Sequence, residues 1–295
     1  MNAPELLPAI AAEPGIYYGM PAEQYHRVEA MSASGAKKML RSPQHYKLMR
    51  DTPSEPTDAM QFGTAVHAGV LEPDTFAQVV ICEPSDAPRR PTSAQLRAKK
   101  PSPETIDAIA FWQEFNRASI GKIVLSAEDH ARALNCIAAV RAHPAAQKLL
   151  DGAAIETSVF WRDGRYGVPC KSRRDIVSHG GISDLKTCAD ASPEAFARSI
   201  ATFLYHCQAA AYFSGHEHVC NETPRFFCLI AVESDPPHGV AVYSLPSNAI
   251  LAGAHLWNIA LERYAEALAS GQYPGYPQTI ETITLPKWAT TFNAY

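Results

Sequence analysis

The chain changes character at about Ala153, where stretches rich in alanine and apolar residues give way to β-branched and aromatic ones. The N-terminal part predicts helices over 35–41, with Ser34 as the cap, over 60–71, and over 104–150 with a break at 119–126. The C-terminal part predicts strands over 155–161, 168–177, 182–187, 226–232 and 239–245, and helices over 192–216 and 247–270.

Helices followed by three strands, a helix, two strands and a helix predict an α/β fold with a helical N-terminal part. Residues 1–14, rich in Ala and Pro, are expected to form a flexible arm, and residues 15–295 a single domain. Within that domain we expect a mainly helical part over 15–150, an α/β core over 153–270 and an irregular tail over 271–295.

Composition narrows the class of protein. The chain has 26 Lys and Arg against 30 Asp and Glu, a formal net charge of −4, and 46% hydrophobic residues, which excludes a disordered chain. No apolar run reaches the roughly 18 residues of a membrane span, so we expect a cytoplasmic protein with no membrane partner. The seven cysteines contain no C-x-x-C pair and predict buried thiols. On composition alone, nucleic acid is an unfavoured partner.

The most informative segment contains Asp175 and the run Asp184-Leu185-Lys186. Alternate residues of a strand share a face, so Asp184 and Lys186 project together while Leu185 points into the core. A neighbouring strand lies about 5 Å away and brings Asp175 beside Asp184. Two such carboxylates repel each other unless a cation lies between them, which Mg²⁺ or Mn²⁺ would provide. An ion pair on a solvated face has the same spacing.

Other residues extend this cluster. Glu156 lies on the preceding strand and adds a third carboxylate, while Gln208 and Tyr212, four residues apart, share one face of the following helix. Basic residues crowd the hairpin that leads to Asp175, namely Arg162, Arg165, Lys171, Arg173 and Arg174. Two more basic stretches occupy 89–100 and 37–41. These stretches are either solvated surface or contacts to DNA phosphates.

The order Glu156, Asp175, Asp184-Leu185-Lys186, Gln208 and Tyr212 resembles that of the PD-(D/E)XK nuclease superfamily. Within it, the chain resembles the exonuclease VIII (RecE-type) nuclease domain of the phage-type exonuclease branch. The segments that carry this resemblance are 15–18, 25–26, 32–34, 62–67, 71–73, 156–161, 171–175, 182–187 and 205–208. They cover most of the chain, from Gly15 to Val232.

The resemblance implies a restriction-endonuclease-like core, in which helices flank a mixed central sheet. It implies that His67, Asp175, Asp184 and the Leu185 carbonyl hold Mg²⁺ or Mn²⁺, with two ions per site. Lys186 would orient or deprotonate the attacking water, with Glu156 as an additional acid. Gln208 and Tyr212 would assist Lys186 or hold the phosphate. Asp184 stands where the superfamily more often has glutamate.

The function that the resemblance implies is metal-dependent exonuclease activity, 5′ to 3′ on linear double-stranded DNA, in phage-type recombination. It also implies a homo-oligomeric ring that threads DNA and works with a single-strand annealing protein. Alternatives remain open: an endonuclease or single-strand nuclease, a CRISPR-adaptation type, which usually has a cysteine cluster, or a non-catalytic DNA-binding recombination protein. Without the resemblance, a hydrolase of small phosphoesters is a further alternative.

Overall fold

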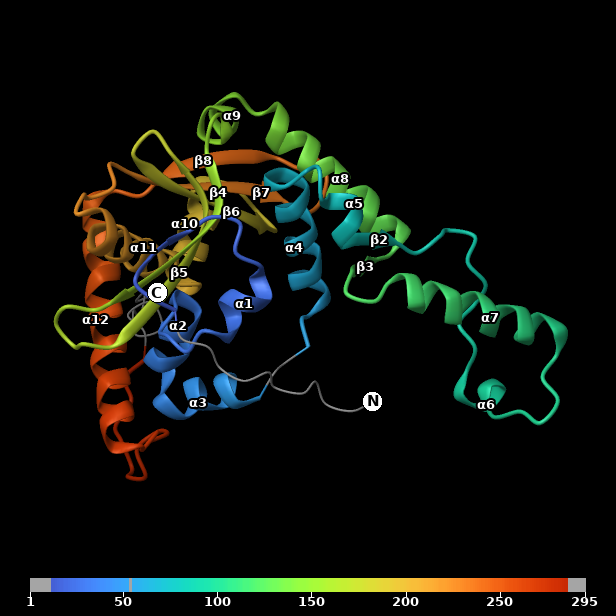
Figure 1. Cartoon of the computed structure of the whole chain (residues 1–295), viewed down its shortest axis with the longest axis horizontal. Coiled ribbons are helices and arrows are strands. Elements are labelled where there is room, and N and C mark those ends of the chain that lie inside the picture. The colour runs from blue at the N-terminus through green and yellow to red at the C-terminus, as the bar shows by residue number, and fades with distance from the viewer. Residues whose placement is uncertain (1–11, 53–54, 286–295) are drawn as a thin grey trace, which may run out of the picture.

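A six-stranded mixed sheet forms the centre of the computed structural model, which describes residues 12–52 and 55–285 (Figure 1). Its strands lie in the order β1-β4-β5-β6-β7-β8. Their bounds are β1 (Gly15–Tyr17), β4 (Ala154–Arg162), β5 (Pro169–Ser178), β6 (Gly181–Cys188), β7 (Phe227–Glu233) and β8 (Val240–Ser244). This mixed sheet with flanking helices confirms the predicted fold class.

Strands β4, β5 and β6 form an antiparallel meander, as predicted from the turns at Asp163-Gly164 and His179-Gly180. Strand β7 then pairs with β6 in parallel, and β8 returns antiparallel to β7. The crossover from β6 to β7 carries α10 (Pro193–Thr202) and α11 (Tyr205–Cys220). The edge strand β1 was not predicted, because three residues are too few for a recognisable period.

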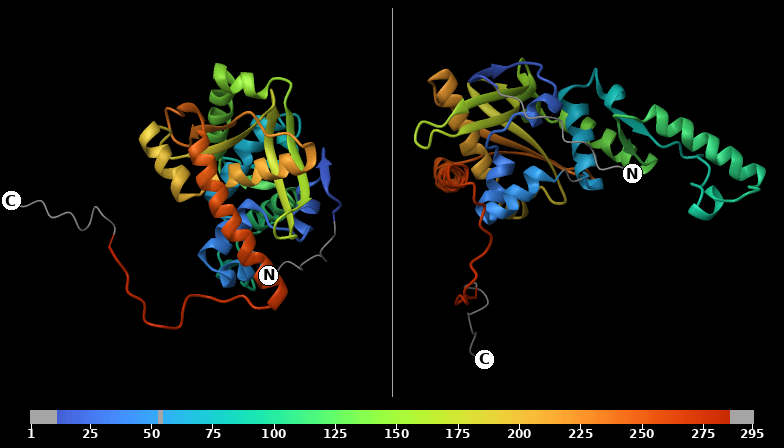
Figure 2. Two further views of the ribbon diagram at one scale, coloured as in Figure 1. Left: turned by 90° about the vertical axis from the view of Figure 1, so that its left-hand side faces the viewer. Right: turned by 60° about the horizontal axis from the view of Figure 1, so that its bottom comes forward.

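Helices cover both faces of the sheet (Figure 2). One face carries α2 (Ala33–Arg41), α11 and α12 (Ser247–Ser270), and the other α4 (Asp58–Leu71), α8 (Ala127–Ala142) and α9 (Pro144–Leu150). The remaining helices are α1 (Ala22–Arg27), α3 (Pro43–Asp51), α5 (Phe76–Val79), α6 (Ser93–Leu96) and α7 (Pro103–Ala118). A second, two-stranded sheet pairs β2 (Val80–Cys82) with β3 (Ile123–Leu125).

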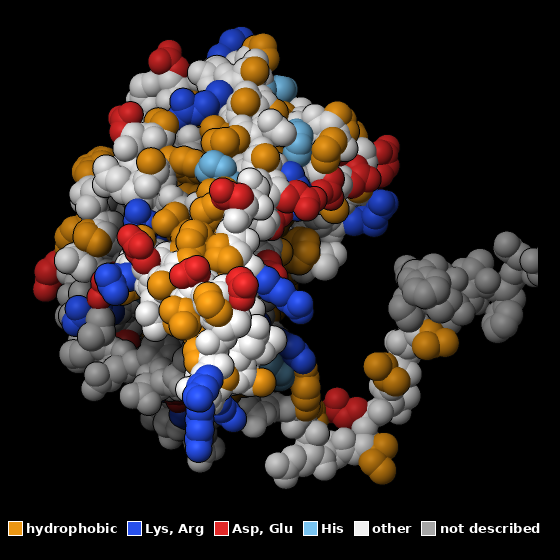
Figure 3. All heavy atoms as spheres, turned by 90° about the vertical axis from the view of Figure 1, so that its right-hand side faces the viewer, with side chains coloured by type: hydrophobic (Ala, Val, Ile, Leu, Met, Phe, Trp, Pro, Cys, Tyr) orange, Lys and Arg blue, Asp and Glu red, His pale blue; other side chains and the backbone are white. Residues whose placement is uncertain are grey.

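Acidic and basic side chains are interspersed over the face shown in Figure 3, which has no continuous basic coat. No helix in the described part of the chain is long and apolar enough to cross a membrane. All seven cysteines are free thiols, and Cys136, Cys170 and Cys207 are buried. The prediction of buried thiols is therefore confirmed for these three, while Cys82, Cys188, Cys220 and Cys228 are half-buried.

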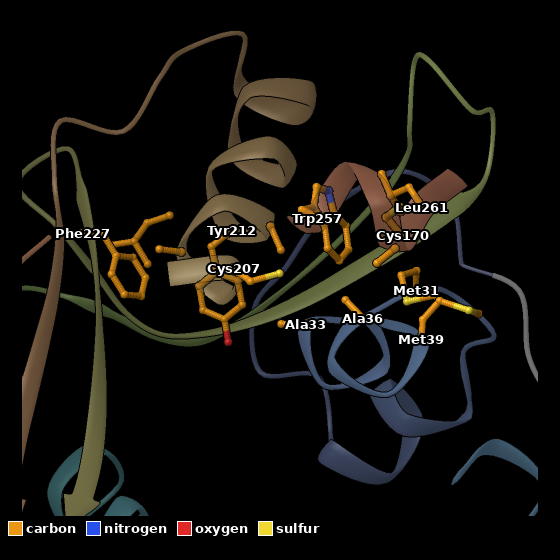
Figure 4. Close-up of a cluster of buried hydrophobic side chains, with 14 of the residues drawn as sticks. Met31, Ala33, Ala36, Met39, Cys170, Cys207, Tyr212, Phe227, Trp257 and Leu261 are labelled. Atoms are coloured by element: carbon orange, nitrogen blue, oxygen red, sulfur yellow. The ribbon is translucent and has the colours of Figure 1, made fainter. Parts of the chain in front are cut away.

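The larger of the core clusters fixes α2 against β5, α11 and α12 (Figure 4). Met31, Ala36 and Met39 are fully buried there and meet Cys170 and Cys207. The ring of Tyr212 lies at the edge of this cluster, and its hydroxyl points away from the apolar side chains. The packing of α2 therefore brings an N-terminal helix beside the residues of β5 and α11.

Two predictions about helices are wrong. Ser32, rather than Ser34, caps α2 by accepting a hydrogen bond from the Gly35 amide. The helix predicted over 192–216 is two helices, since Leu204 has a φ of 54° that interrupts the helical backbone.

The basic stretch 89–100 contains the short helix α6. Residues 271–285 form neither helix nor strand, as expected for the tail, while its residues 286–295 lie outside the described residues. Residues 1–11 of the expected N-terminal arm also lie outside them.

The crossing of α11 and α12 has no room for a side chain at Gly253. A Cβ atom there would overlap the backbone carbonyl of His206 and lie 2.9 Å from the Cys207 amide nitrogen. Gly253→Ala should therefore lower the free energy of unfolding by about 1–3 kcal/mol, although alanine favours helices. Thermal melting checks this, with the exposed Leu251→Ala as control. An unchanged melting temperature for Gly253→Ala would contradict the close packing.

Candidate active site

The two aspartates lie where strands β5 and β6 separate. The β5–β6 ladder ends at the pair Ile176–Ser183, and the next position would set Asp175 opposite Asp184. Instead, an Asp175 carboxylate oxygen accepts a hydrogen bond from the Leu185 amide, at 2.9 Å. Both aspartates are buried, and Leu185 is in the core as the strand alternation predicted. Burial and the charge of Asp184 raise the pKa of Asp175 well above its ordinary value.

Glu156 faces the same fork from β4. It stands between the ladder pairs Ile155–Ile176 and Thr157–Arg174, so its position is opposite Asp175. Its φ of 51° is left-handed, a conformation that strains a residue with a Cβ atom. The Glu156 carboxylate pairs with the Arg173 guanidinium. Strain of this kind concentrates at functional sites, and here it accompanies a carboxylate turned towards another carboxylate.

His67 of α4 completes a group of potential ligands. Single ligand atoms of His67, Glu156 and Asp175 lie within 4.8 Å of one another. The His67 Nε2 is 2.6 Å from the Leu185 carbonyl oxygen, and since that oxygen only accepts, Nε2 carries the hydrogen. Burial and the charge of Lys186 lower the pKa of His67, so the ring is neutral. Its bare Nδ1 then lies 3.5 Å from an Asp175 oxygen.

These three groups are all hydrogen-bond acceptors that face one another. The Arg173 guanidinium balances the charge of Glu156 alone, so a further cation between the bare imidazole nitrogen and the two carboxylates would relieve their repulsion. Oxygen donors with one imidazole suit Mg²⁺ or Mn²⁺. The cluster therefore fits the divalent cation on which PD-(D/E)XK nucleases generally depend.

Asp184 is held in a separate network beside this cluster. Its Oδ1 accepts a hydrogen bond of 2.6 Å from Gln208 Nε2, and its Oδ2 pairs with the Lys186 ammonium. Gln208 Nε2 also donates to the Tyr212 hydroxyl at 2.9 Å, and that hydroxyl donates to the Arg173 carbonyl at 2.7 Å. Both amide hydrogens of Gln208 are thus used, and they fix the orientation of Asp184.

The pKa of Lys186 determines what the lysine can do. Burial alone would lower this pKa, but the Asp184 and Asp175 carboxylates outweigh burial and raise it. Lys186 is consequently a protonated donor in this arrangement. Burial and the same two carboxylates raise the pKa of Tyr212, whose hydroxyl stays protonated as well.

A cavity of about 360 Å³ opens onto the site, and Lys37 of α2 lies in its wall. Asp175, Glu156 and Gln208 line the same cavity. The ammonium groups of Lys37 and Lys186 lie 5.1 and 5.0 Å from the centroid of the Tyr205 ring. Burial and the Lys186 charge lower the pKa of Lys37 to about 8. The only sequence signal was the basic stretch 37–41, in which Lys38 is exposed.

Some of the basic residues expected to contact DNA are buried in the structure, and others are exposed. Lys171 is buried, and its ammonium donates to the backbone carbonyls of Tyr25, His26 and Val28. Arg174 is 1% exposed and bonds Thr157 and His216.

The prediction that Lys171 and Arg174 contact DNA is therefore wrong, because their charged groups form hydrogen bonds inside the protein. Arg173 is occupied by Glu156 and by the Met20 carbonyl. Arg162 and Arg165 are exposed at the β4–β5 hairpin, and they retain the expected role as a prediction.

A forked β-meander with Asp175 on one strand and Asp184-x-Lys186 on the next is the arrangement of the PDDEXK-like class of proteins. Residues 32–286 match a family described as "PDDEXK-like domain of unknown function (DUF3799)". The chain belongs to this DUF3799 family, which places it in the PD-(D/E)XK nuclease superfamily.

A comparison with solved structures finds a similar fold. A crystal structure from Eubacterium rectale, described as a candidate exonuclease, is similar to this chain with a TM-score of 0.59 and 12% identity. The similarity covers 94% of this chain and 100% of that one. At this identity the likeness concerns the fold. No curated protein matches the sequence.

Proposed function

We propose that this protein is a metal-dependent DNA exonuclease that hydrolyses phosphodiester bonds of linear double-stranded DNA from 5′ to 3′ in phage-type recombination. The observation that carries the nuclease chemistry is the group of facing acceptors, His67, Glu156 and Asp175, within 4.8 Å of one another. The Asp184–Lys186 pair beside it supplies the second carboxylate and the lysine of the motif.

In this proposal, Asp175, Asp184, Glu156, His67 and the Leu185 carbonyl hold Mg²⁺ or Mn²⁺. Divalent ions, two per site, supply an activated water and neutralise charge on the leaving oxygen. Holding the ions requires rigid ligands, and the hydrogen bonds to Asp175 and Asp184 provide that rigidity.

The protein's own donors act on the water and the phosphate. Lys186 is protonated and orients a water through its ammonium group, since the Asp184 charge keeps its pKa high. Gln208 positions Asp184, and Tyr212 positions the Gln208 amide. Attack on phosphorus builds negative charge on the non-bridging oxygens, which a cation on the cavity wall stabilises.

Dependence on a DNA end separates an exonuclease from an endonuclease. Linear duplexes labelled at the 5′ or the 3′ end and a closed circle should be incubated with Mg²⁺ or Mn²⁺. The proposal expects early release of the 5′ label and an intact circle. Digestion of the circle as fast as the linear duplex would instead favour an endonuclease. Binding of DNA without cleavage would favour a non-catalytic recombination protein.

The proposal includes a homo-oligomeric ring and a single-strand annealing partner. Both rest on the resemblance to the RecE-type domain. Light scattering on the purified chain tests the ring, which requires a mass that is a multiple of 32.1 kDa. A monomer at working concentration would contradict it.

Lys37 lies on the cavity wall where a phosphate would approach the site. Lys37→Ala should reduce DNA hydrolysis about 10- to 100-fold, because a hydrogen bond from a charged donor contributes about 1.5–3 kcal/mol. Initial rates check this, with the neighbouring exposed Lys38→Ala as matched control. Equal losses in both variants would contradict a specific role for Lys37.

The pKa of Lys37 adds a pH signature. Because its pKa is lowered to about 8, the ammonium charge is present below that pH and is lost as pH rises through it. The rate of DNA hydrolysis should therefore decline as pH rises through this pKa. Lys37→Arg keeps its charge at higher pH and should move the decline upward. If activity declined at the same pH in Lys37→Arg as in the wild type, the titrating group would be a residue other than Lys37.

A further inference from the structure

An arm formed by residues 83–122 leaves the body between β2 and β3 and contains α6 and α7 (Figures 1 and 2). Its root is fixed by the parallel ladder from Val80–Ile123 to Cys82–Leu125. Val80 and Leu125 belong to the core cluster that also contains Val66 of α4, next to His67. The arm is thus anchored on the helix that carries the active-site histidine.

The arm has a packing arrangement of its own. The indole of Trp112 donates to the Pro88 carbonyl at 2.9 Å, and the Arg90 guanidinium lies 3.7 Å from the Trp112 ring centroid. Trp112 and Phe115 are buried but lie in none of the three core clusters of the described residues. The arm is therefore an ordered projection that the body does not use for its core.

Charge is segregated along this arm. Residues 89–100 contain five cations and no acid: Arg89, Arg90, Arg97, Lys99 and Lys100. All five are exposed, and Arg90 is the member with a carboxylate partner, Glu83, among the described residues. Figure 3 shows Lys and Arg side chains projecting at the lower end of this side of the molecule, while both signs of charge are interspersed above them.

We propose that the arm binds the sugar–phosphate backbone of duplex DNA outside the catalytic cavity. The inference rests on the proposed function for its substrate. Exposed cations without carboxylate partners bind a polyanion with little desolvation cost, and a chain of net charge −4 needs such a local concentration. The binding surface is the segment 89–100, because helix α7 itself carries the three acids Glu104, Asp107 and Glu114.

A second copy of the chain is the competing occupant, because Leu96, Ile106 and Ile120 are exposed on the same arm. Five cations in twelve residues disfavour contact between two identical arms, since like charges repel. Charge complementarity instead favours the phosphate backbone.

The test uses the full chain with Arg97, Lys99 and Lys100 changed together to Gln. Binding of a labelled linear duplex is measured by fluorescence anisotropy in chelator, where hydrolysis is not required, over a series of salt concentrations. Each lost phosphate contact reduces the slope of log affinity against log salt by about 0.9, so the slope should fall by about 2–3 units. Lys148, Arg198 and Arg225, exposed elsewhere and changed together to Gln, are the matched control.

The outcomes separate this inference from the proposed function. Weaker, less salt-dependent binding by the arm variant but not by the control variant supports the arm as a DNA-binding surface. Equal binding by wild type and arm variant overturns the inference and leaves the nuclease proposal standing. A change in molecular mass with unchanged DNA affinity assigns the arm to contact between copies. A wild-type protein that binds no duplex overturns both.

Discussion

Asp184→Asn is expected to reduce DNA hydrolysis by about 10³-fold. Asparagine keeps the shape of the side chain but removes the charge that would hold a cation and that pairs with Lys186. Loss of a metal ligand removes several kcal/mol of transition-state stabilisation, and each 1.36 kcal/mol is about tenfold in rate. Gln208 can still donate to the Oδ1 of Asn, so the fold should survive.

Two measurements check this expectation. Release of acid-soluble nucleotides gives the rate, and the rise of melting temperature on addition of Mn²⁺ reports metal binding. Both should be lost in Asp184→Asn. The exposed Asp151→Asn is the control for loss of one carboxylate and should resemble the wild type. Wild-type rates in Asp184→Asn would remove Asp184 from the site.

Lys186→Met should reduce the rate of DNA hydrolysis by about 10²–10⁴-fold. The substitution should leave metal binding intact. Methionine fills the volume of the lysine stem but cannot donate a hydrogen bond to water. The Lys186 ammonium also occupies Asp184 Oδ2, so its removal frees that oxygen for a cation. The Mn²⁺-induced rise of the melting temperature should therefore be retained or increased.

This combination distinguishes a catalytic lysine from a structural one. A Lys186→Met protein that loses both hydrolysis and the Mn²⁺ response would indicate that the lysine only maintains the fold of the site. The exposed Lys148→Met controls for replacement of a lysine by methionine. Full activity in Lys186→Met would contradict its role in orienting water.

Strand alternation made part of this site predictable. The period of two set Leu185 in the core and placed Asp184 and Lys186 together, and the Gly-Gly turn placed Asp175 on the adjacent strand. Local sequence also predicted the meander, because the turns at both ends of β5 carry glycine. Short-range signals of this kind do not depend on tertiary packing.

Features that arise from packing were not predictable. Lys37 reaches the cavity only because α2 packs against β5 and α11. Lys171 lies inside because the end of α1 and the residue after it, Val28, cover its ammonium group with three carbonyl oxygens. The left-handed conformations of Glu156 and Leu204 could not be predicted from the sequence, since neither glutamate nor leucine favours a positive φ.

The most direct test of the account measures nucleotide release from a linear duplex by the wild type and by Asp175→Asn, in Mg²⁺ and after chelation. The cluster of facing acceptors around Asp175 predicts release that requires both the metal and the carboxylate. Chelation should stop the wild type, renewed Mg²⁺ should restore it, and Asp175→Asn should stay inactive throughout. Hydrolysis by the wild type in chelator, or by Asp175→Asn at the wild-type rate, would contradict a metal-dependent nuclease site at the β5–β6 fork.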